Sequence, residues 1–244
     1  MIDPSFMRAF ATVKQWPDRG ALPRVLPFAL FIAFVALEEG ARTAALRQWF
    51  VLPEPVLYAL YPVKACSVAA LLLLWRGSYP ELHLRDLLDL KRSTLAVVVG
   101  LITFLVWINL QVTLPLVGGA AGFDPTLLPE GAPRLVLTAA RVAGAVLVVP
   151  VMEELFWRSF LLRYLVHPDF ESVPLGSFSW SSFLVASALF ALEHHFFLAG
   201  LAAGAIYNLL LYRTRSLALC VMAHAVTNLV LAMYVLHSGK WYFW

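Results

Sequence analysis

The sequence predicts an all-α protein, a polytopic transmembrane helical bundle of about seven spans, with eight as the alternative count. Hydrophobic residues make up 61% of the 244 residues and charged residues only 14%, against roughly 45–50% and about 25% in soluble proteins. A soluble chain of this size has too little interior for so much apolar surface, so lipid must solvate it. The apolar residues form continuous runs without the alternation of a transmembrane β-barrel, which leaves helices.

Each expected span is an apolar stretch near the roughly 20 residues that cross a hydrocarbon core of about 30 Å. The stretches are 22–37, 55–75, 95–117, 135–165, 183–197, 198–211 and 217–236. The fourth is long enough to include an interfacial turn. The fifth and sixth are short and nearly contiguous, so they form either a tight hairpin or a re-entrant pair. The connectors carry turn formers and no soluble appendage, so residues 1–244 are expected to form a single integral membrane domain.

Lysine and arginine in the loops predict the orientation, because cytoplasmic loops carry an excess of both. With seven spans and a cytoplasmic N-terminus, twelve cations fall on the cytoplasmic side: Arg8, Lys14, Arg19, Arg24, Arg76, Arg85, Lys91, Arg92, Arg158, Arg163, Arg213 and Arg215. Four fall on the other side: Arg42, Arg47, Arg134 and Lys240. The bias places the C-terminus outside. These cations are scattered and form no basic stripe, so no nucleic-acid partner is expected.

Ionisable side chains inside the spans are the sequence's main functional signal, because such groups are costly at bilayer depth unless they are paired or wetted. Glu154 and Arg158 stand four residues apart on one helix face and can pair. Glu153 is rotated about 100° from Glu154 and has Trp157, not a cation, at the fourth position after it. A paired carboxylate is a poor proton acceptor, so Glu153 is the better candidate for a general base.

Two more helices present polar residues at the same spacing. His224 and Asn228 stand four residues apart, as do Phe190 and His194. A carboxylate that activates water, with two imidazoles to hold it, suits peptide hydrolysis without a covalent intermediate. Asn228 is a candidate donor to the oxyanion. The alternative for any one of these residues is interhelical hydrogen bonding, but the whole set exceeds what helix association needs.

Whether a metal takes part stays open at this point. Glu153, His194 and His224 have the ligand types of a catalytic zinc site with one open position, whereas hydrogen bonds alone also position a water molecule. The sequence contains no His-Glu-x-x-His motif and no aspartate within a span, which excludes a zincin-type and an aspartyl membrane protease.

Three motifs carry a resemblance to a known family. Residues 153–158 read Glu-Glu-x-x-x-Arg, residues 190–194 read Phe-x-x-x-His, and residues 224–228 read His-x-x-x-Asn, all within 150–230. In this order and at these separations the chain resembles the CPBP family (CAAX protease and bacteriocin-processing, or Abi), to which the Ras-converting CAAX endopeptidase belongs. It is similar to the bacterial branch associated with exosortase systems.

The resemblance implies a glutamate-dependent intramembrane endopeptidase in a bacterial inner membrane, with a conical cavity opening toward the cytosolic side. Glu153 would be the general base and His194 would orient the water. His224 and Asn228 would stabilise the oxyanion or complete a metal site, and Glu154 with Arg158 would support the base. The implied partners are the lipid bilayer and a membrane-associated protein or peptide substrate, while the family leaves open whether that substrate is prenylated.

Two other functions fit a membrane protein with this composition. A non-catalytic scaffold or bacteriocin-immunity protein of the same fold would be favoured if a catalytic position had changed, and none has. A proton-coupled transporter would use the glutamates and histidines as a relay. It would be expected to show inverted repeats or paired broken helices, and the sequence shows neither.

Overall fold

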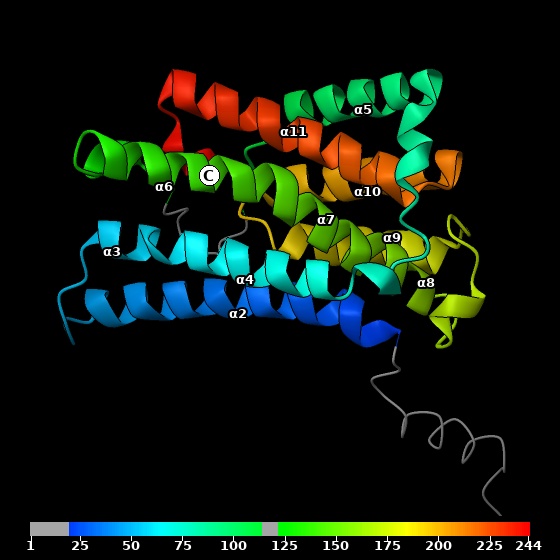
Figure 1. Ribbon diagram of the computed structural model, residues 1–244, viewed down its shortest axis with the longest axis horizontal. Helices are drawn as coiled ribbons and strands as arrows, with labels where there is room; N and C mark the ends of the chain where they lie inside the picture. Colours follow the sequence, from blue (N-terminus) through cyan, green and yellow to red (C-terminus); the bar gives the residue numbers. More distant parts are fainter. Residues whose placement is uncertain (1–19, 114–121) are drawn as a thin grey trace, which may run out of the picture.

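The computed structural model describes residues 20–113 and 122–244, which fold into helices with no strand among them. The helices are α2 (Ala21–Leu46), α3 (Glu54–Tyr58), α4 (Leu60–Leu74), α5 (Leu90–Asn109), α6 (Ala132–Ala143), α7 (Val149–Glu154), α8 (Leu162–Tyr164), α9 (Trp180–Leu192), α10 (Phe197–Thr214) and α11 (Leu217–Ser238) (Figure 1). The all-helical prediction is confirmed. The end of the stretch expected over 95–117 lies partly outside the described residues.

The central element is a long rod that carries the Glu-Glu-x-x-x-Arg motif. Two π-helical turns, Gly144–Val148 and Leu155–Leu161, join α6, α7 and α8 into one continuous helix, so the structure has no interfacial turn in this stretch. Pro150 has no N–H to donate. The carbonyl five residues before it, that of Ala145, instead accepts a hydrogen bond of 2.8 Å from Nδ2 of Asn228. The widened helix therefore docks onto α11 at the His-x-x-x-Asn motif.

The rod lies between two helix pairs, of which α2 and α4 run antiparallel and α5 and α11 run parallel (Figure 1). On one side α2 packs along α4, and on the other α5 packs along α11, and the rod contacts members of both pairs. Gly100 of α5 lies against the backbone of α11, because a Cβ there would come within 2.5 Å of the Ala223 carbonyl oxygen. Small residues permit this close helix contact in membranes, and it sets the position of the His-x-x-x-Asn face.

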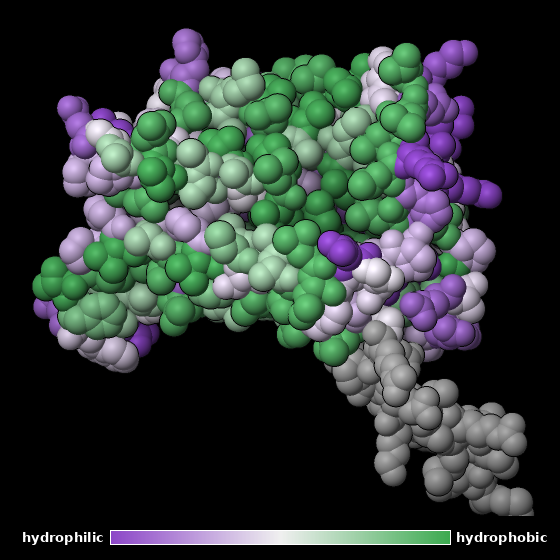
Figure 2. Space-filling model, viewed as in Figure 1, coloured by the Kyte–Doolittle hydropathy of each residue, from purple (hydrophilic) through white to green (hydrophobic). Residues whose placement is uncertain are grey.

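Within the part of the chain that the structure describes, five helical segments are long and apolar enough to cross a membrane: Ala21–Leu46, Glu54–Leu74, Leu90–Asn109, Ala132–Tyr164 and Leu217–Ser238. Hydrophobic side chains cover the middle of the surface and hydrophilic ones gather at its two ends (Figure 2). The remaining two expected spans are α9 and α10, which pack against each other as a hairpin. At 13 residues, α9 is shorter than the roughly 20 residues that cross a bilayer, and α10 turns back toward the end at which α9 begins. The pair is named the re-entrant hairpin for this path, and the number of spans it contributes stays a prediction.

The bundle has two ends, named here after Arg163, which lies near one of them, and Trp244, which folds back from the other (Figure 1). The Arg163 end holds the starts of α2, α5, α9 and α11 and the ends of α4, α8 and α10. The Trp244 end holds the ends of α2, α5 and α11 and the starts of α3 and α6. A buried ion-pair network closes the Arg163 end, where Arg24 forms a two-pronged contact of 2.8 Å with Glu81. Burial opposes ionisation of Glu81, but hydrogen bonds from Arg24 and Ser159 outweigh it and lower the pKa of the Glu81 carboxyl.

Small residues also hold the re-entrant hairpin together. Gly200 and Gly204 of α10 lie against α9, and a Cβ at Gly200 would stand 3.0 Å from Ala191 Cα and 3.2 Å from His194 Cβ. The two backbones can thus approach closely. The turn between α9 and α10, residues 193–196, is thereby held at the depth of the Glu-Glu-x-x-x-Arg motif.

Candidate active site

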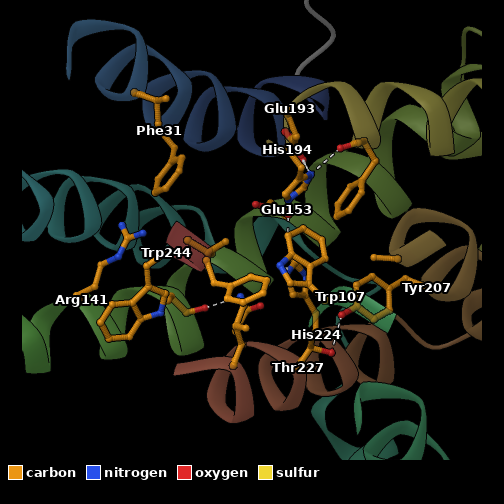
Figure 3. A pocket seen from close by; sticks show the side chains of 18 of the residues that line it. Phe31, Trp107, Arg141, Glu153, Glu193, His194, Tyr207, His224, Thr227 and Trp244 are labelled. Carbon is orange, nitrogen blue, oxygen red and sulfur yellow. Dashed lines mark hydrogen bonds and ion pairs between the residues drawn. The ribbon is translucent and has the colours of Figure 1, made fainter. Parts of the chain in front are cut away.

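A cavity of about 270 Å³ lies between α2, the central rod, the hairpin turn and α11. Most of its wall is apolar or aromatic, and polar side chains converge on its inner part (Figure 3). The ionisable and polar residues that line it are Arg141, Glu153, Glu193, His194, His224, Thr227 and Asn228. Of the six residues predicted to form the site, four line this cavity, and Glu154 and Arg158 lie behind its wall.

Glu153 is the carboxylate that faces the cavity. Its side chain is buried, and its Oε2 has no hydrogen-bond partner among the described residues. The nearest cationic or imidazole nitrogen is Nε2 of His224, 4.0 Å away, which is beyond direct hydrogen-bonding distance. A buried polar atom without a partner is costly, and such atoms gather at functional sites.

Glu154 points away from Glu153 and into the protein, as the 100° rotation between adjacent helical residues requires. It is completely buried, and its Oε1 lies 3.2 Å from Nη1 of Arg158 and 3.0 Å from Nδ1 of His224. The ion pair expected from the four-residue spacing is thus present. Because Glu154 accepts from the Nδ1–H of His224, the lone pair of that imidazole is on Nε2, the nitrogen nearer to Glu153.

Arg158 extends this network to the re-entrant hairpin. Its Nε donates to Oδ1 of Asn208 at 3.2 Å, and its Nη2 donates to the carbonyl of Gly204 at 3.3 Å. The guanidinium also lies over the rings of Phe190 and Tyr207, 4.7 and 5.3 Å from their centroids. Asn208 was not predicted from the sequence as part of the site. A polar amide inside the apolar stretch 198–211 is the feature that could have indicated it.

His194 lies in the turn after α9 and not on a helix, so the prediction that all three motifs lie on helices is wrong for this residue. The spacing of Phe190 and His194 has a different physical role. The carbonyl of Phe190 belongs to the last turn of α9 and lacks a helical partner, and Nδ1–H of His194 donates to it at 2.7 Å. Nε2 of His194 is left as the acceptor, and Trp107 packs edge-on against the ring.

His224 and Asn228 occupy one face of α11, as their spacing predicts. The ring of Tyr207 stacks on His224 at 5.1 Å, and Tyr207 also donates a hydrogen bond of 2.8 Å to Thr227. The π-helical turn of the rod accepts one N–H of Asn228. An amide nitrogen carries two N–H donors, so the second is available on the cavity side.

Glu193 is a third carboxylate in the site. It accepts a 3.0 Å hydrogen bond from Nε1 of Trp157. One ligand atom each from Glu153, Glu193 and His194 lie within 4.8 Å of one another. The set expected for a metal was Glu153, His194 and His224. In the structure Glu193 joins Glu153 and His194 in this group, and Nε2 of His224 lies 4.0 Å from Glu153.

The second glutamate pair, Glu38 and Glu39, has no part in this cavity. The sequence from Glu38 to Arg42 resembles the first motif but is one residue too short. Glu38 binds Lys64 at 3.0 Å, Arg42 binds Glu54 at 2.5 Å, and Glu39 is exposed.

Comparison with known proteins agrees with the geometry. Residues 135–230 match the family model described as type II CAAX prenyl endopeptidase, Rce1-like. The resemblance to the CAAX protease family is confirmed. The Rce1-like segment contains all three motifs, the central rod from residue 135, the re-entrant hairpin and the first half of α11. No curated protein and no solved structure matches the chain. An Rce1-like segment within membrane-spanning helices indicates an intramembrane endopeptidase with a membrane-embedded peptide substrate.

The Glu154–Arg158 pair predicts a stability effect that is separate from catalysis. Replacing Glu154 by Gln leaves a buried guanidinium without its anion, which costs about 3–5 kcal/mol in comparable buried pairs. Arg158→Lys should also destabilise the protein, because an ammonium cannot contact Glu154, Asn208 and Gly204 together. We expect a lower midpoint of thermal unfolding in detergent for both variants.

The matched control for these variants is Glu39→Gln, a change of the same type at an exposed position. Its unfolding midpoint should equal that of the wild type. Wild-type midpoints for Glu154→Gln and Arg158→Lys would show that the buried pair does not support the fold.

Proposed function

We propose that the protein is a glutamate-dependent intramembrane endopeptidase in which Glu153 is the general base. The observation that carries the proposal is the Glu153 carboxylate, which is buried, faces the cavity, and has an oxygen without a hydrogen-bond partner among the described residues. The neighbouring Glu154 is neutralised by Arg158 and bound to His224. Glu154 also has an oxygen, Oε2, without a partner in the described part of the chain, but it lies behind the cavity wall. Of the two adjacent carboxylates, Glu153 is therefore the one that can take a proton from a water molecule in the cavity.

The surrounding groups support hydrolysis by an activated water. A water molecule bound to Glu153 and to Nε2 of His194 would attack the peptide carbonyl carbon, and its proton would pass to Glu153. The new oxyanion would accept hydrogen bonds from the second N–H of Asn228. Glu153 would then return the proton to the departing amine, which leaves an acid and an amine as products.

The two rival functions are less well supported. A non-catalytic scaffold or immunity protein has no need for an unpaired buried carboxylate, which is costly to keep. A proton-coupled transporter needs a path to both sides of the membrane. Between Glu153 and the Arg163 end, the described core is filled by residues such as Leu155, Leu217 and Leu219, each with no exposed surface.

Glu153→Gln should reduce peptide cleavage by several orders of magnitude, because an amide cannot accept the proton of the attacking water. The protein should remain folded, because Glu153 has no close ion pair to lose among the described residues. Its one charged contact within them is the 4.0 Å approach to His224. We suggest measuring cleavage of apolar peptides by the purified protein in lipid nanodiscs, by mass spectrometry. Near wild-type turnover of Glu153→Gln, beside a folded and inactive Glu154→Gln, would reverse the roles assigned to the two glutamates.

A divalent cation remains a proposal for this site. Two carboxylates and an imidazole are ligand types that a zinc or similar ion accepts, and Glu153, Glu193 and His194 would hold it. Bound there, the ion would lower the pKa of a water molecule and polarise the peptide carbonyl.

The metal proposal is testable through metal content. We expect about one equivalent of zinc in the purified wild type by elemental analysis, and much less in Glu193→Gln, because that variant removes one of three ligands. The matched control is Glu171→Gln, an exposed position at the Arg163 end. Metal-free protein that retains full activity after treatment with membrane-permeant chelators would leave Glu153 as a base that acts without a metal.

We also propose that the cavity is accessible from the extracytoplasmic side. It extends from Glu153 toward the Trp244 end, where Phe243 and Trp244 form part of its wall. The excess of loop cations lies at the opposite end, which the positive-inside rule assigns to the cytoplasm. The family resemblance implies an opening on the cytosolic side, whereas the loop charges place the Trp244 end on the opposite side. These two expectations exclude each other. We favour the charge bias, because it is a property of this chain.

Labelling with a membrane-impermeant maleimide in intact cells tests this orientation. In a background with Cys66 and Cys220 replaced by Ala, Ser238→Cys should be labelled, because it lies exposed at the Trp244 end. Ser172→Cys lies exposed at the Arg163 end and should react only after the cells are lysed. The reverse pattern would place the cavity on the cytoplasmic side.

A further inference from the structure

A second chamber adjoins the catalytic cavity on the side of the Trp244 end. Its volume is about 240 Å³, and it shares five wall residues with the first cavity: Phe31, Val35, Tyr61, Arg141 and Trp244. The new wall residues include the charged Glu38, Arg42 and Lys64. Nothing in the proposed hydrolysis uses this chamber.

Two of the three cations in this chamber have carboxylate partners and one does not. Lys64 binds Glu38 at 3.0 Å, and Arg42 binds Glu54 at 2.5 Å. Arg141 has no carboxylate within 4.0 Å among residues 20–113 and 122–244. Its Nε is buried and has no hydrogen-bond acceptor there.

The position of Arg141 makes a missing anion expensive. Arg141 is nine residues from the start of α6, which corresponds to about 13 Å of helix. Its backbone therefore stands well in from the Trp244 end of the rod, and the residue is half-buried. The Tyr61 ring lies 4.4 Å from the guanidinium carbon, and Tyr61 itself packs on Gly144, where a Cβ would be 2.7 Å from the phenol oxygen. An aromatic face only partly compensates a desolvated cation.

We propose that Arg141 binds a carboxylate of the peptide substrate and so fixes which bond reaches Glu153. The two residues line the same cavity (Figure 3) and are twelve positions apart on the rod, about 18 Å along a helix. An extended peptide rises about 3.3–3.6 Å per residue. The carboxylate would therefore stand roughly five residues from the scissile bond.

The charge distribution of the cavity gives the peptide a direction. Glu153 and Glu193 make the inner end acidic, and Arg141 makes the outer end basic, next to the second chamber. Among the described wall residues, the inner end offers an anionic group no arginine or lysine, whereas Arg141 offers it a cation at the outer end. The planar fork of a guanidinium matches the two oxygens of a carboxylate, whether these belong to an Asp or Glu side chain or to a free C-terminus.

This inference rests on the proposed peptidase function, so the experiment has a binding arm and a cleavage arm. The probes are apolar decapeptides in three forms: C-terminal acids, C-terminal amides, and C-terminal amides with one internal Glu. In the cleavage arm, wild-type protein in nanodiscs should show a kcat/KM at least tenfold higher for a carboxylate-bearing form than for the plain amides, mainly through KM. The form that is preferred identifies the source of the carboxylate.

Substitution of Arg141 tests the assignment. In Arg141→Gln, kcat/KM for the carboxylate-bearing peptides should fall to nearly the value for the plain amides. Arg141→Glu should instead cleave peptides that carry Lys in place of the carboxylate more efficiently. The matched control is Arg134→Gln. Arg134 is on the same helix and lines neither cavity, and its guanidinium is held by the Leu128 carbonyl at 2.8 Å. This control should keep the wild-type ratio.

The binding arm uses Glu153→Gln protein, in which labelled peptides are bound without being cut, and reads fluorescence anisotropy. Acids should bind at least tenfold more tightly than plain amides, and adding Arg141→Gln should remove that preference. Equal binding of acids and amides, or a preference that survives Arg141→Gln, would refute the carboxylate site. A clear preference in binding with no cleavage by wild-type protein would instead refute the peptidase.

Discussion

The completely buried carboxylate of Glu154 is the group on which the arrangement of the site depends. It binds Arg158 on its own helix and His224 on α11, and Arg158 continues to Asn208 and Gly204 on α10. One anion thus connects the central rod, the re-entrant hairpin and the last helix. Ion pairs in an apolar interior add little net stability, but the loss of one partner leaves a charge that nothing solvates. The network therefore favours a single arrangement of the three elements.

The same network gives the two adjacent glutamates, Glu153 and Glu154, different roles. A helix turns about 100° per residue, so Glu154 points into the protein while Glu153 points into the cavity. By binding Nδ1 of His224, Glu154 turns the other nitrogen of that ring toward Glu153. The end carbonyl of α9 does the same for His194. In the neutral tautomers that these contacts select, both imidazoles present Nε2 as the nitrogen that can accept a hydrogen bond from water or bind a metal.

The cavity is asymmetric along the membrane normal. Toward the Arg163 end it is closed by packed side chains and by the network around Arg24 and Glu81. Toward the Trp244 end it continues into a second chamber in which Arg141 has no carboxylate partner among the described residues. An acidic inner end and a basic outer end suit a peptide that is held by a negative charge and cut some residues away from it.

Local sequence patterns were sufficient for the fold class, the pairing of Glu154 with Arg158 and the shared face of His224 and Asn228. Composition decides that lipid is the solvent, and residues four apart on a helix are neighbours in any helical fold. The family resemblance also depends only on motif order and spacing. These features are local, so they could be predicted without knowing how the helices pack.

Tertiary structure decided everything that depends on which helices meet and at what depth. The stretch over 183–211 is ambiguous in the sequence because apolar content alone does not separate two spans from a re-entrant pair. Only the packing shows that Gly200 and Gly204 bring α10 against α9 and that Arg158 donates to the carbonyl of Gly204. Glu193 joins the site, and Asn208 supports it, because the hairpin turn lies beside the rod. Arg141 became significant only when the packing left it beside a cavity, with no carboxylate within 4.0 Å among the described residues. Partners that are distant in sequence are chosen by packing, and no local pattern encodes that choice.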